Sequence, residues 1–158
     1  MSTGAADVML VQVGGSSYAL PVCAVREIVR LPPVTRVPGL PAFVAGLANV
    51  RGRVLAVIDL RPLLRLEAPR GDRLVILDGA GTSDAAFGNG TRAIVGLVVD
   101  AARDLVQLPE GGLEPLPPGV PAEAAAVLDG ITVVDGTPVA VLSPAGLLGL
   151  RRHLSSAA

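Results

Sequence analysis

Few side chains in this sequence could carry out bond chemistry. The chain has one His, one Cys and one Tyr, and its thirteen Lys and Arg positions are all arginine. A Ser–His–Asp arrangement could only use His153, which lies near the expected end of the last helix, where a cation at a helix terminus is the better interpretation. The absence of lysine excludes Schiff-base and phosphate-loop lysines. We therefore predict no catalytic residues, and so no enzyme.

Metal binding is equally poorly supported. Sites for transition metals take three or four ligands from His, Cys and carboxylates. The fourteen acidic residues are scattered and lack the spacing of a calcium loop. Cys23 has no second cysteine to pair with, which is consistent with a reducing cytoplasm. We predict no metal and a cytoplasmic location.

One short motif is similar to the beginning of a dinucleotide fingerprint. Gly79-Ala80-Gly81 follows an expected strand, but Asp84 stands where the third glycine would be, and no helix is expected after it. We interpret Gly79–Thr91 as a flexible hairpin loop and predict no cofactor. A small nucleotide-binding enzyme that uses the Gly79–Gly81 loop remains an alternative.

The composition argues for an ordered protein that does not bind nucleic acid. Hydrophobic residues make up 51%, aromatic residues 2%, and the net charge is −1. Proteins that bind single-stranded nucleic acid combine basic grooves with aromatic side chains; a nucleic-acid-binding β-barrel is therefore kept only as an alternative. Prolines and glycines interrupt the apolar stretch of residues 37–50, and the start of the chain lacks the pattern of a secretory signal, so we expect no membrane insertion.

Short runs of β-branched residues between Gly, Pro and Asp predict an all-β fold, mainly β with short helices. About nine short strands favour a barrel or sandwich. Val25–Leu31 is expected to be a helical turn that leads into a further strand. The other strands are expected at residues 8–13, 17–22, 47–50, 53–58, 73–77, 93–99, 105–108, 129–134 and 137–142.

Two hairpins and two helix starts have local signals. Arg51-Gly52 is expected at the tip of one hairpin, and Asp135-Gly136 is typical of a tight type I′ turn. Asp59 should cap a helix over Leu60–Leu66, and Ser143 one over Ala145–Leu154. Residues 109–121 hold five prolines and should be irregular. No repeat of fixed period and no linker between domains is visible.

Many of these segments together resemble the CheW-like family. The resemblance covers roughly residues 7–150, and the order and spacing of the segments make it more specific than any single motif. The matching segments are Tyr18-Ala19-Leu20-Pro21-Val22, Val25-Arg26-Glu27-Ile28, Pro41-Ala42-Phe43-Val44-Ala45-Gly46, Asn49-Val50-Arg51-Gly52, Val57-Ile58-Asp59-Leu60, Val95-Gly96-Leu97-Val98-Val99-Asp100, Leu128-Asp129-Gly130 and Val141–Leu148.

The resemblance implies a fold and a function. The fold is a pair of intertwined five-stranded SH3-like β-barrel subdomains that share a core. Residues 1–158 would form one CheW-like domain with a core over 7–150 and flexible tails at 1–6 and 155–158. The function is that of a chemotaxis adaptor, which binds the regulatory domain of a CheA-type histidine kinase and the cytoplasmic tip of a methyl-accepting chemoreceptor.

The resemblance also implies a partner-binding surface. Apolar side chains on it would anchor a partner, and charged ones would fix the register. Two alternatives stay open: Glu27 and Arg51 form an intramolecular salt bridge, or Val25 and Ile28 are buried in the barrel. A wider set of arginines at 51, 53, 61, 65, 70 and 73 is interpreted mainly as a solvated face. The implied binding residues are Val25, Glu27, Ile28, Gly46, Asn49, Arg51 and, more weakly, Val99.

Overall fold

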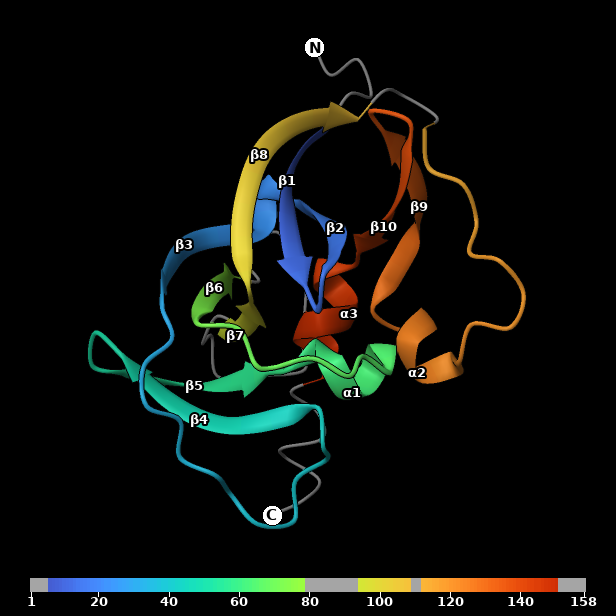
Figure 1. Cartoon of the computed structure of the whole chain (residues 1–158). Helices are drawn as coiled ribbons and strands as arrows, with labels where there is room; N and C mark the ends of the chain where they lie inside the picture. Colours follow the sequence, from blue (N-terminus) through green and yellow to red (C-terminus); the bar gives the residue numbers. More distant parts are fainter. Residues whose placement is uncertain (1–5, 79–93, 109–111, 151–158) are drawn as a thin grey trace.

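Two five-stranded sheets make up the molecule (Figure 1). The computed structural model describes residues 6–78, 94–108 and 112–150. One sheet, here called barrel A, has the strand order β8-β1-β2-β10-β9, and the other, barrel B, has the order β3-β6-β7-β5-β4. The strands are β1 (Ala6–Val13), β2 (Ser16–Pro21), β3 (Val25–Arg30), β4 (Val44–Val50), β5 (Arg53–Ile58), β6 (Arg73–Asp78), β7 (Ile94–Val99), β8 (Ala101–Leu108), β9 (Leu128–Val134) and β10 (Thr137–Leu142). The helices are η1 (Val22–Ala24), α1 (Leu60–Leu64), α2 (Ala122–Ala125) and α3 (Pro144–Gly149).

The chain passes from barrel A to barrel B and back. It builds β1 and β2 in barrel A, then all of barrel B, and returns to barrel A with β8, β9 and β10. In each barrel one strand pair is parallel, β10 with β2 and β5 with β7, while the remaining pairs are antiparallel. This confirms the predicted pair of intertwined five-stranded subdomains.

An isolated backbone bridge draws the edge strands of each barrel together. In barrel B, the chain that leaves β3 pairs with β4 between Thr35 and Leu47, and in barrel A the chain that leaves β8 pairs with β9 between Glu114 and Ile131. A glycine faces each bridge. A Cβ at Gly46 would lie 2.2 Å from the Thr35 oxygen, and one at Gly130 would lie 2.4 Å from the Glu114 oxygen. Only glycine allows this close approach of two backbones.

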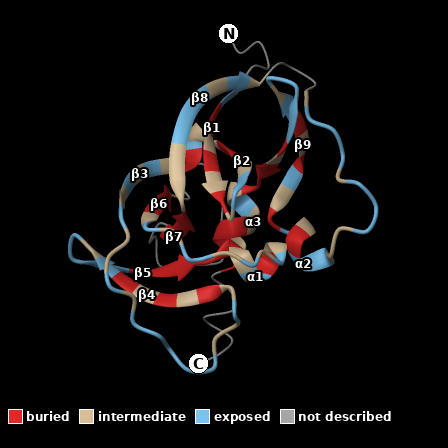
Figure 2. Cartoon of the chain, viewed as in Figure 1, coloured by how far each residue is buried: buried red, intermediate tan, exposed pale blue. Residues whose placement is uncertain are grey.

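The core has three parts, which follow the alternation of side chains along the strands. On β7, Ile94 and Val98 point into barrel B, whereas Val95, Leu97 and Val99 point into a larger core that both sheets share. Barrel A has its own small interior around Val8 and Val141. Buried residues lie along the strands of both barrels (Figure 2). The shared core ties the two barrels together.

Two short helices begin at side-chain caps, as predicted. Asp59 accepts a hydrogen bond from the backbone N–H of Arg61 at 3.0 Å, and Ser143 Oγ accepts one from Gly146 N at 3.0 Å. Helix α1 ends at Leu64, two residues before the predicted end, because Arg65 takes a left-handed conformation. Helix α3 begins at Pro144, one residue early, and the predicted part beyond residue 150, with His153, lies outside the described residues.

Asp59 is a buried charge held by one arginine. Arg61 donates from Nε and Nη2 to the carboxylate, with the shortest contact at 2.6 Å, and from Nη1 to the Ala68 carbonyl at 2.6 Å. Burial by itself would raise the pKa of Asp59, but the hydrogen bonds and positive charge of Arg61 outweigh it and hold the pKa below its usual value. The Asp59–Arg61 pair thus fixes the turn after α1.

Other expected boundaries need correction. The helical turn expected within Val25–Leu31 lies earlier, as η1, and β3 begins directly at Val25. Strand β8 begins at Ala101 rather than at residue 105, because pairing with β1 extends it through residues of low strand propensity. The expected Gly79–Thr91 loop lies outside the described residues.

An internal repeat relates the two barrels, contrary to the expectation from the sequence. Residues 44–59 and 128–143 correspond one to one: both have the same shift in strand register at the glycine and a two-residue turn at the tip. Strand β3 corresponds to β8, with Arg26-Glu27-Ile28 matching Arg103-Asp104-Leu105, because the register of each strand against its neighbour shifts at the same place. Few residues are identical between the copies, and their strands interleave in the chain. The sequence therefore shows no simple period.

Candidate partner-binding surface on barrel B

A tight hairpin places Arg51 at the tip of strands β4 and β5. Arg51 and Gly52 have φ values of 54° and 82°, and Val50 pairs with Arg53 across the turn, which is the geometry of a type I′ turn. Asn49 supports the turn, since its Oδ1 accepts a hydrogen bond from Gly52 N at 2.9 Å. The predicted tip is confirmed, and the Arg51 side chain is 76% exposed.

Strand β3 brings two more charges to the same place. A register shift pairs Val25 with Leu77 but Glu27 with Ile76, so that Glu27 lies over the interior of barrel B. Glu27 Oε2 lies 3.4 Å from Arg51 Nη2, and its side chain is 30% exposed. Arg26 lies 3.5 Å from Asp78. The intramolecular salt bridge between Glu27 and Arg51, kept open above, is therefore present.

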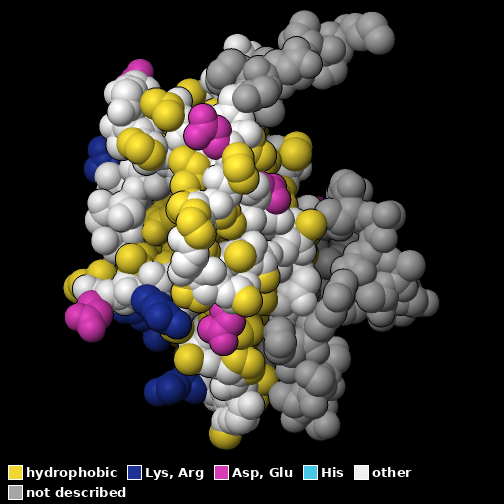
Figure 3. Space-filling model, turned by 90° about the vertical axis from the view of Figure 1, so that its right-hand side faces the viewer, with side chains coloured by type: hydrophobic (Ala, Val, Ile, Leu, Met, Phe, Trp, Pro, Cys, Tyr) yellow, Lys and Arg dark blue, Asp and Glu magenta, His cyan; other side chains and the backbone are white. Residues whose placement is uncertain are grey.

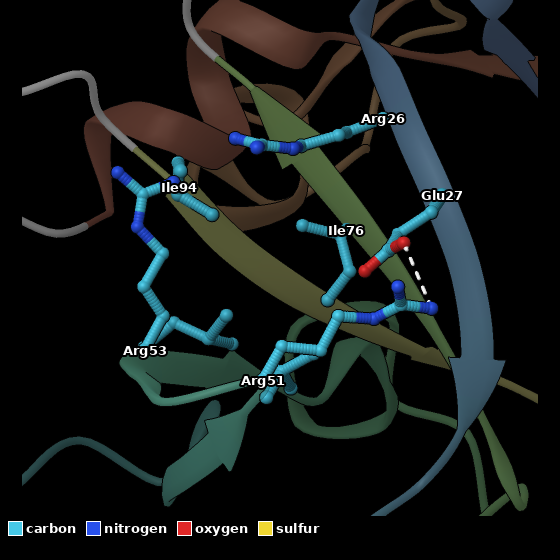
Figure 4. Close-up of a pocket in the computed structure, with 8 residues that line it drawn as sticks. Arg26, Glu27, Arg51, Arg53, Ile76 and Ile94 are labelled. Atoms are coloured by element: carbon cyan, nitrogen blue, oxygen red, sulfur yellow. Dashed lines mark ion pairs between the residues drawn. The ribbon is translucent and has the colours of Figure 1, made fainter.

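Between these charges the surface forms a hollow at the mouth of barrel B. Its volume is about 120 Å³. Figure 4 shows Ile76 lying between Arg26, Glu27 and Arg51, with Arg53 beside Ile94. The hollow therefore has an apolar floor and a charged rim, and we call its rim residues Arg26, Glu27, Arg51 and Arg53 face B.

The predicted binding residues divide into two groups. Glu27 and Arg51 line the hollow, and Asn49 shapes the turn next to it. Ile28 is 40% exposed on β3. Whether Val25 and Ile28 are buried was left open above. Ile28 is exposed, whereas Val25 is half-buried and packs against the shared core.

The other two predicted residues are buried. Val99 is 0% exposed and belongs to the shared core, and Gly46 is buried against the Thr35 backbone. Neither presents a side chain to a partner in this conformation. We therefore leave both out of the binding surface described below.

Sequence reasoning missed several residues of the hollow. Arg26 and Arg53 each stand within two residues of a predicted position, but alternation along a strand would place Arg26 on the opposite face from Glu27. Both line the hollow where the register of β3 shifts, which no sequence signal marks. Ile76 and Ile94 come from β6 and β7, far from the hairpin in the chain, and no local signal marks them. Among the wider arginine set, Arg73 pairs with the exposed Asp72, as a solvated face would, whereas Arg61 pairs with the buried Asp59.

A second surface of different character lies on the opposite side of the molecule. Figure 3 views the side that carries β9, α2 and the segment 112–121, and shows mostly apolar side chains with few charged ones. A hollow of about 280 Å³ lies there. Apolar surfaces of this kind often contact other proteins. The residues that line this hollow include Leu116, Pro117, Val120, Leu128 and Ile131.

Among the described residues, neither surface gathers side chains that could hold a metal ion. Within the described ranges, no three His, Cys, Asp or Glu residues gather as metal ligands would. Of the helices in those ranges, none has the length and apolar character needed to cross a membrane. The Gly79–Gly81 motif lies outside the described residues.

Comparisons with known proteins agree on one family. Residues 7–152 match the family model described as CheW-like domain. The chain is 34% identical to the chemotaxis protein CheW of Bacillus subtilis over 68% of its own length and 64% of that protein. It is 30% identical to the chemotaxis protein CheW of Rhizobium meliloti over 74% of its length and 70% of that protein. The matched part thus covers just under two thirds of the length of the Bacillus subtilis protein.

A solved structure supports the same relation. The scaffolding protein TtCheW of Thermoanaerobacter tengcongensis is similar with a TM-score of 0.70 and 25% sequence identity, over 87% of this chain and 88% of that one. The similarity therefore includes both barrels.

Proposed function

Because the chain belongs to the CheW-like domain family, we propose that it is a chemotaxis-type signal-transduction adaptor that acts by binding proteins and performs no catalysis. Its partners would be the regulatory domain of a CheA-type histidine kinase and the cytoplasmic tip of a chemoreceptor. The protein would work in the cytoplasm, held at receptor arrays through these partners. The observation that carries the proposal is face B, where charged side chains surround an apolar hollow on a fold shared with a scaffolding protein.

The chemistry of face B suits protein recognition. Arginine binds carboxylates with good geometry, and apolar contacts surrounded by polar groups are the usual form of a protein interface. Arg26 and Arg51 already have acidic neighbours within the chain, whereas among the described residues Arg53 has no ion-pair partner. An acidic group on a partner could therefore pair with Arg53 without breaking an existing contact.

An adaptor must hold two proteins at once. Face B and the apolar surface of Figure 3 lie on opposite sides of the molecule, so two partners could bind without overlapping. Coupling then requires only that the adaptor bind two kinase states with different affinity, so that a change in the receptor shifts the kinase equilibrium. The alternatives of a nucleic-acid-binding barrel and a nucleotide-binding enzyme have no support among the relatives, which are chemotaxis proteins.

Reversing the charge of Arg51 tests the proposal. We expect Arg51→Glu to weaken binding to an immobilised kinase regulatory domain roughly tenfold or more, because it puts a like charge beside Glu27 and removes a cation from the interface. Arg36→Glu is a control with the same change of charge, since Arg36 is also exposed and lies outside face B and outside both hollows described above. The melting temperature of both variants should stay close to that of the wild type.

The outcome separates binding from folding. If wild-type protein is retained neither by the kinase domain nor by a receptor tip, the adaptor proposal is wrong. Equal losses of binding in Arg51→Glu and Arg36→Glu would show that net charge matters and face B does not.

A further inference from the structure

A further hollow, here called the helix hollow, lies where α1, α2 and α3 meet. Its volume is about 410 Å³. Helix α1 follows β5 of barrel B, α2 precedes β9 of barrel A, and the two helices lie side by side (Figure 1). The hollow therefore lies between parts of the chain that belong to different barrels. The segment before β4 lines it with Phe43, α1 with Leu63, α2 and its cap with Glu123 and Ala126, and the end of α3 with Leu150.

The helix hollow is apolar apart from one charge. Among the described residues that line it, only Glu123 is charged, and the others are apolar. Glu123 is exposed and makes no ion pair within the described part of the chain. A ligand that suits this hollow has an apolar side chain close to a cation, because the apolar wall and the carboxylate are then both matched.

The sequence that follows Leu150 has this composition. It reads Arg151-Arg152-His153-Leu154, and Leu154 is the one large apolar residue after Leu150 in the sequence. Leu150 is the last described residue of α3 and itself lines the hollow, so the next residues leave from the wall of the hollow. Both the charge and the starting point of this segment thus fit the helix hollow.

The spacing of the two leucines fits as well. At Leu150 the backbone is still helical, with φ of −64° and ψ of −19°, and its N–H donates to the Leu147 carbonyl at 3.2 Å. Residues four apart in a helix lie on the same face. One further helical turn would therefore bring Leu154 to the face on which Leu150 lines the hollow.

From these observations we propose that residues 151–154 extend α3 by one turn and dock in the helix hollow of the same molecule. Leu154 enters the apolar part, and the arginines lie toward Glu123. Because the hollow is lined from both barrels, the docked segment clamps α1 to α2 and covers apolar surface that would otherwise meet water. This inference does not depend on the proposed adaptor function.

A single tryptophan can report where the segment lies, because the sequence contains none. Leu154→Trp in the full chain places the reporter at the proposed anchor, and Ala158→Trp is the control four residues later. We expect Leu154→Trp to emit at shorter wavelength than Ala158→Trp and to be quenched several-fold more slowly by acrylamide. The two emission maxima should coincide when both variants are unfolded in urea.

Reversing the charge of the hollow tests the role of Glu123. We expect Glu123→Lys, added to Leu154→Trp, to lower the ratio of docked to undocked segment by roughly fivefold or more, because an exposed attraction becomes a repulsion. Emission should then move to longer wavelength and quenching should become faster. Glu67→Lys is the matched control, since Glu67 is also exposed and does not line the hollow.

Hydrogen exchange of the wild type, which carries no reporter, gives a second measurement. In an extended α3 the amides of His153 and Leu154 are hydrogen-bonded, so they should exchange several-fold more slowly than those of residues 155–158. Equal exchange over residues 151–158, or equal emission of Leu154→Trp and Ala158→Trp in the folded chain, would overturn the proposal. So would equal effects of Glu123→Lys and Glu67→Lys, which would place the reporter against another surface. Protection of the reporter only at rising protein concentration would overturn it too, since the segment would then dock on a second copy.

Discussion

At the residue scale, Arg51 combines an unusual backbone conformation with an exposed charge. Its φ of 54° is a conformation that costs energy for most residues other than Gly, Asn and Asp. The tip of barrel A uses Asp135 at the same position, which suits the turn better. An arginine at this tip is therefore poorly explained by the turn and better explained by what its side chain meets, which includes Glu27 at 3.4 Å.

Exchanging the two charges separates the internal role of this pair from a role in binding. We expect the double variant Glu27→Arg, Arg51→Glu to keep the stability of the wild type, because the ion pair is restored with its polarity reversed and exposed pairs contribute little. Binding to the kinase regulatory domain, measured by titration calorimetry, should stay as weak as in Arg51→Glu. Recovery of wild-type affinity would instead mean that the pair serves only to hold the hairpin against β3.

Asp59 gives a prediction about pH. Its pKa in the folded protein is below its usual value, so its contribution to stability is complete above the pKa of an aspartate in the unfolded chain, about 3.9, and is lost as the pH falls through the lower pKa of the folded state. Asp59→Asn keeps a capping oxygen but loses the charge that Arg61 binds. We expect the variant to be less stable by about 1–3 kcal/mol at neutral pH.

Urea unfolding of wild type and Asp59→Asn from about pH 7 to about pH 3 checks this. The difference in free energy of unfolding should shrink as the pH falls into the range where Asp59 is protonated. A difference that stays constant over the whole range would mean that the charge of Asp59 does not contribute.

At the element scale, the closing of each barrel depends on a glycine that faces a bridge. Gly46→Ala would bring a methyl group to 2.2 Å from the Thr35 oxygen, and a backbone atom cannot move aside as a flexible side chain can. We expect a loss of about 1–3 kcal/mol in the free energy of unfolding, typical of overpacking. Chemical denaturation measures it.

Gly149→Ala is the matched control for that loss. Gly149 lies in α3, and nothing lies within 4 Å of a Cβ added there. Its substitution should leave stability unchanged or raise it by up to about 1 kcal/mol, since alanine favours helix over glycine. If Gly46→Ala proves as stable as Gly149→Ala, the close approach at the Thr35 bridge does not constrain the fold.

The sequence predicts elements well where the signal is local. The turn at Asp135-Gly136, the caps at Asp59 and Ser143 and most of the strands of β-branched residues follow from neighbouring residues, and the structure confirms them. The first half of β8 could not be predicted, because only its pairing with β1 makes residues such as Ala101 and Asp104 a strand.

In the candidate site, too, the residues with a signal in the sequence were predicted, and the contacts between distant strands were not. Glu27 and Arg51 were predicted from the resemblance to a family, but their contact depends on β3 and the β4–β5 hairpin meeting across barrel B. The floor of the hollow comes from Ile76 and Ile94, whose strands lie far along the chain from the hairpin. Val99 was predicted at the surface because its segment matches the family, and burial by both barrels could not be read from that match.

At the scale of the whole molecule, one core joins the two barrels. Leu20 and Leu97 come from different sheets, yet both are fully buried in the same cluster. We propose that residues 1–158 form a single domain, and we expect one unfolding transition with equal calorimetric and van't Hoff enthalpies. Leu97→Ala should lower the stability of both barrels together, by about 2–5 kcal/mol.

Scanning calorimetry of wild type and Leu97→Ala tests this expectation. Two resolved transitions, or a shift in only part of the melting curve of the variant, would show that the barrels unfold separately. The single-domain description would then be wrong.

The central claim is that this chain holds a chemoreceptor and a kinase together, which is a property of the whole molecule. The most direct test immobilises a chemoreceptor tip and measures capture of a CheA-type kinase regulatory domain in the presence and absence of this chain, with Arg51→Glu in parallel. The account predicts that capture of the kinase domain is well above the level measured without this chain. It also predicts that Arg51→Glu raises capture less than the wild type does. Binding of each partner alone without joint capture, so that one displaces the other, would contradict it.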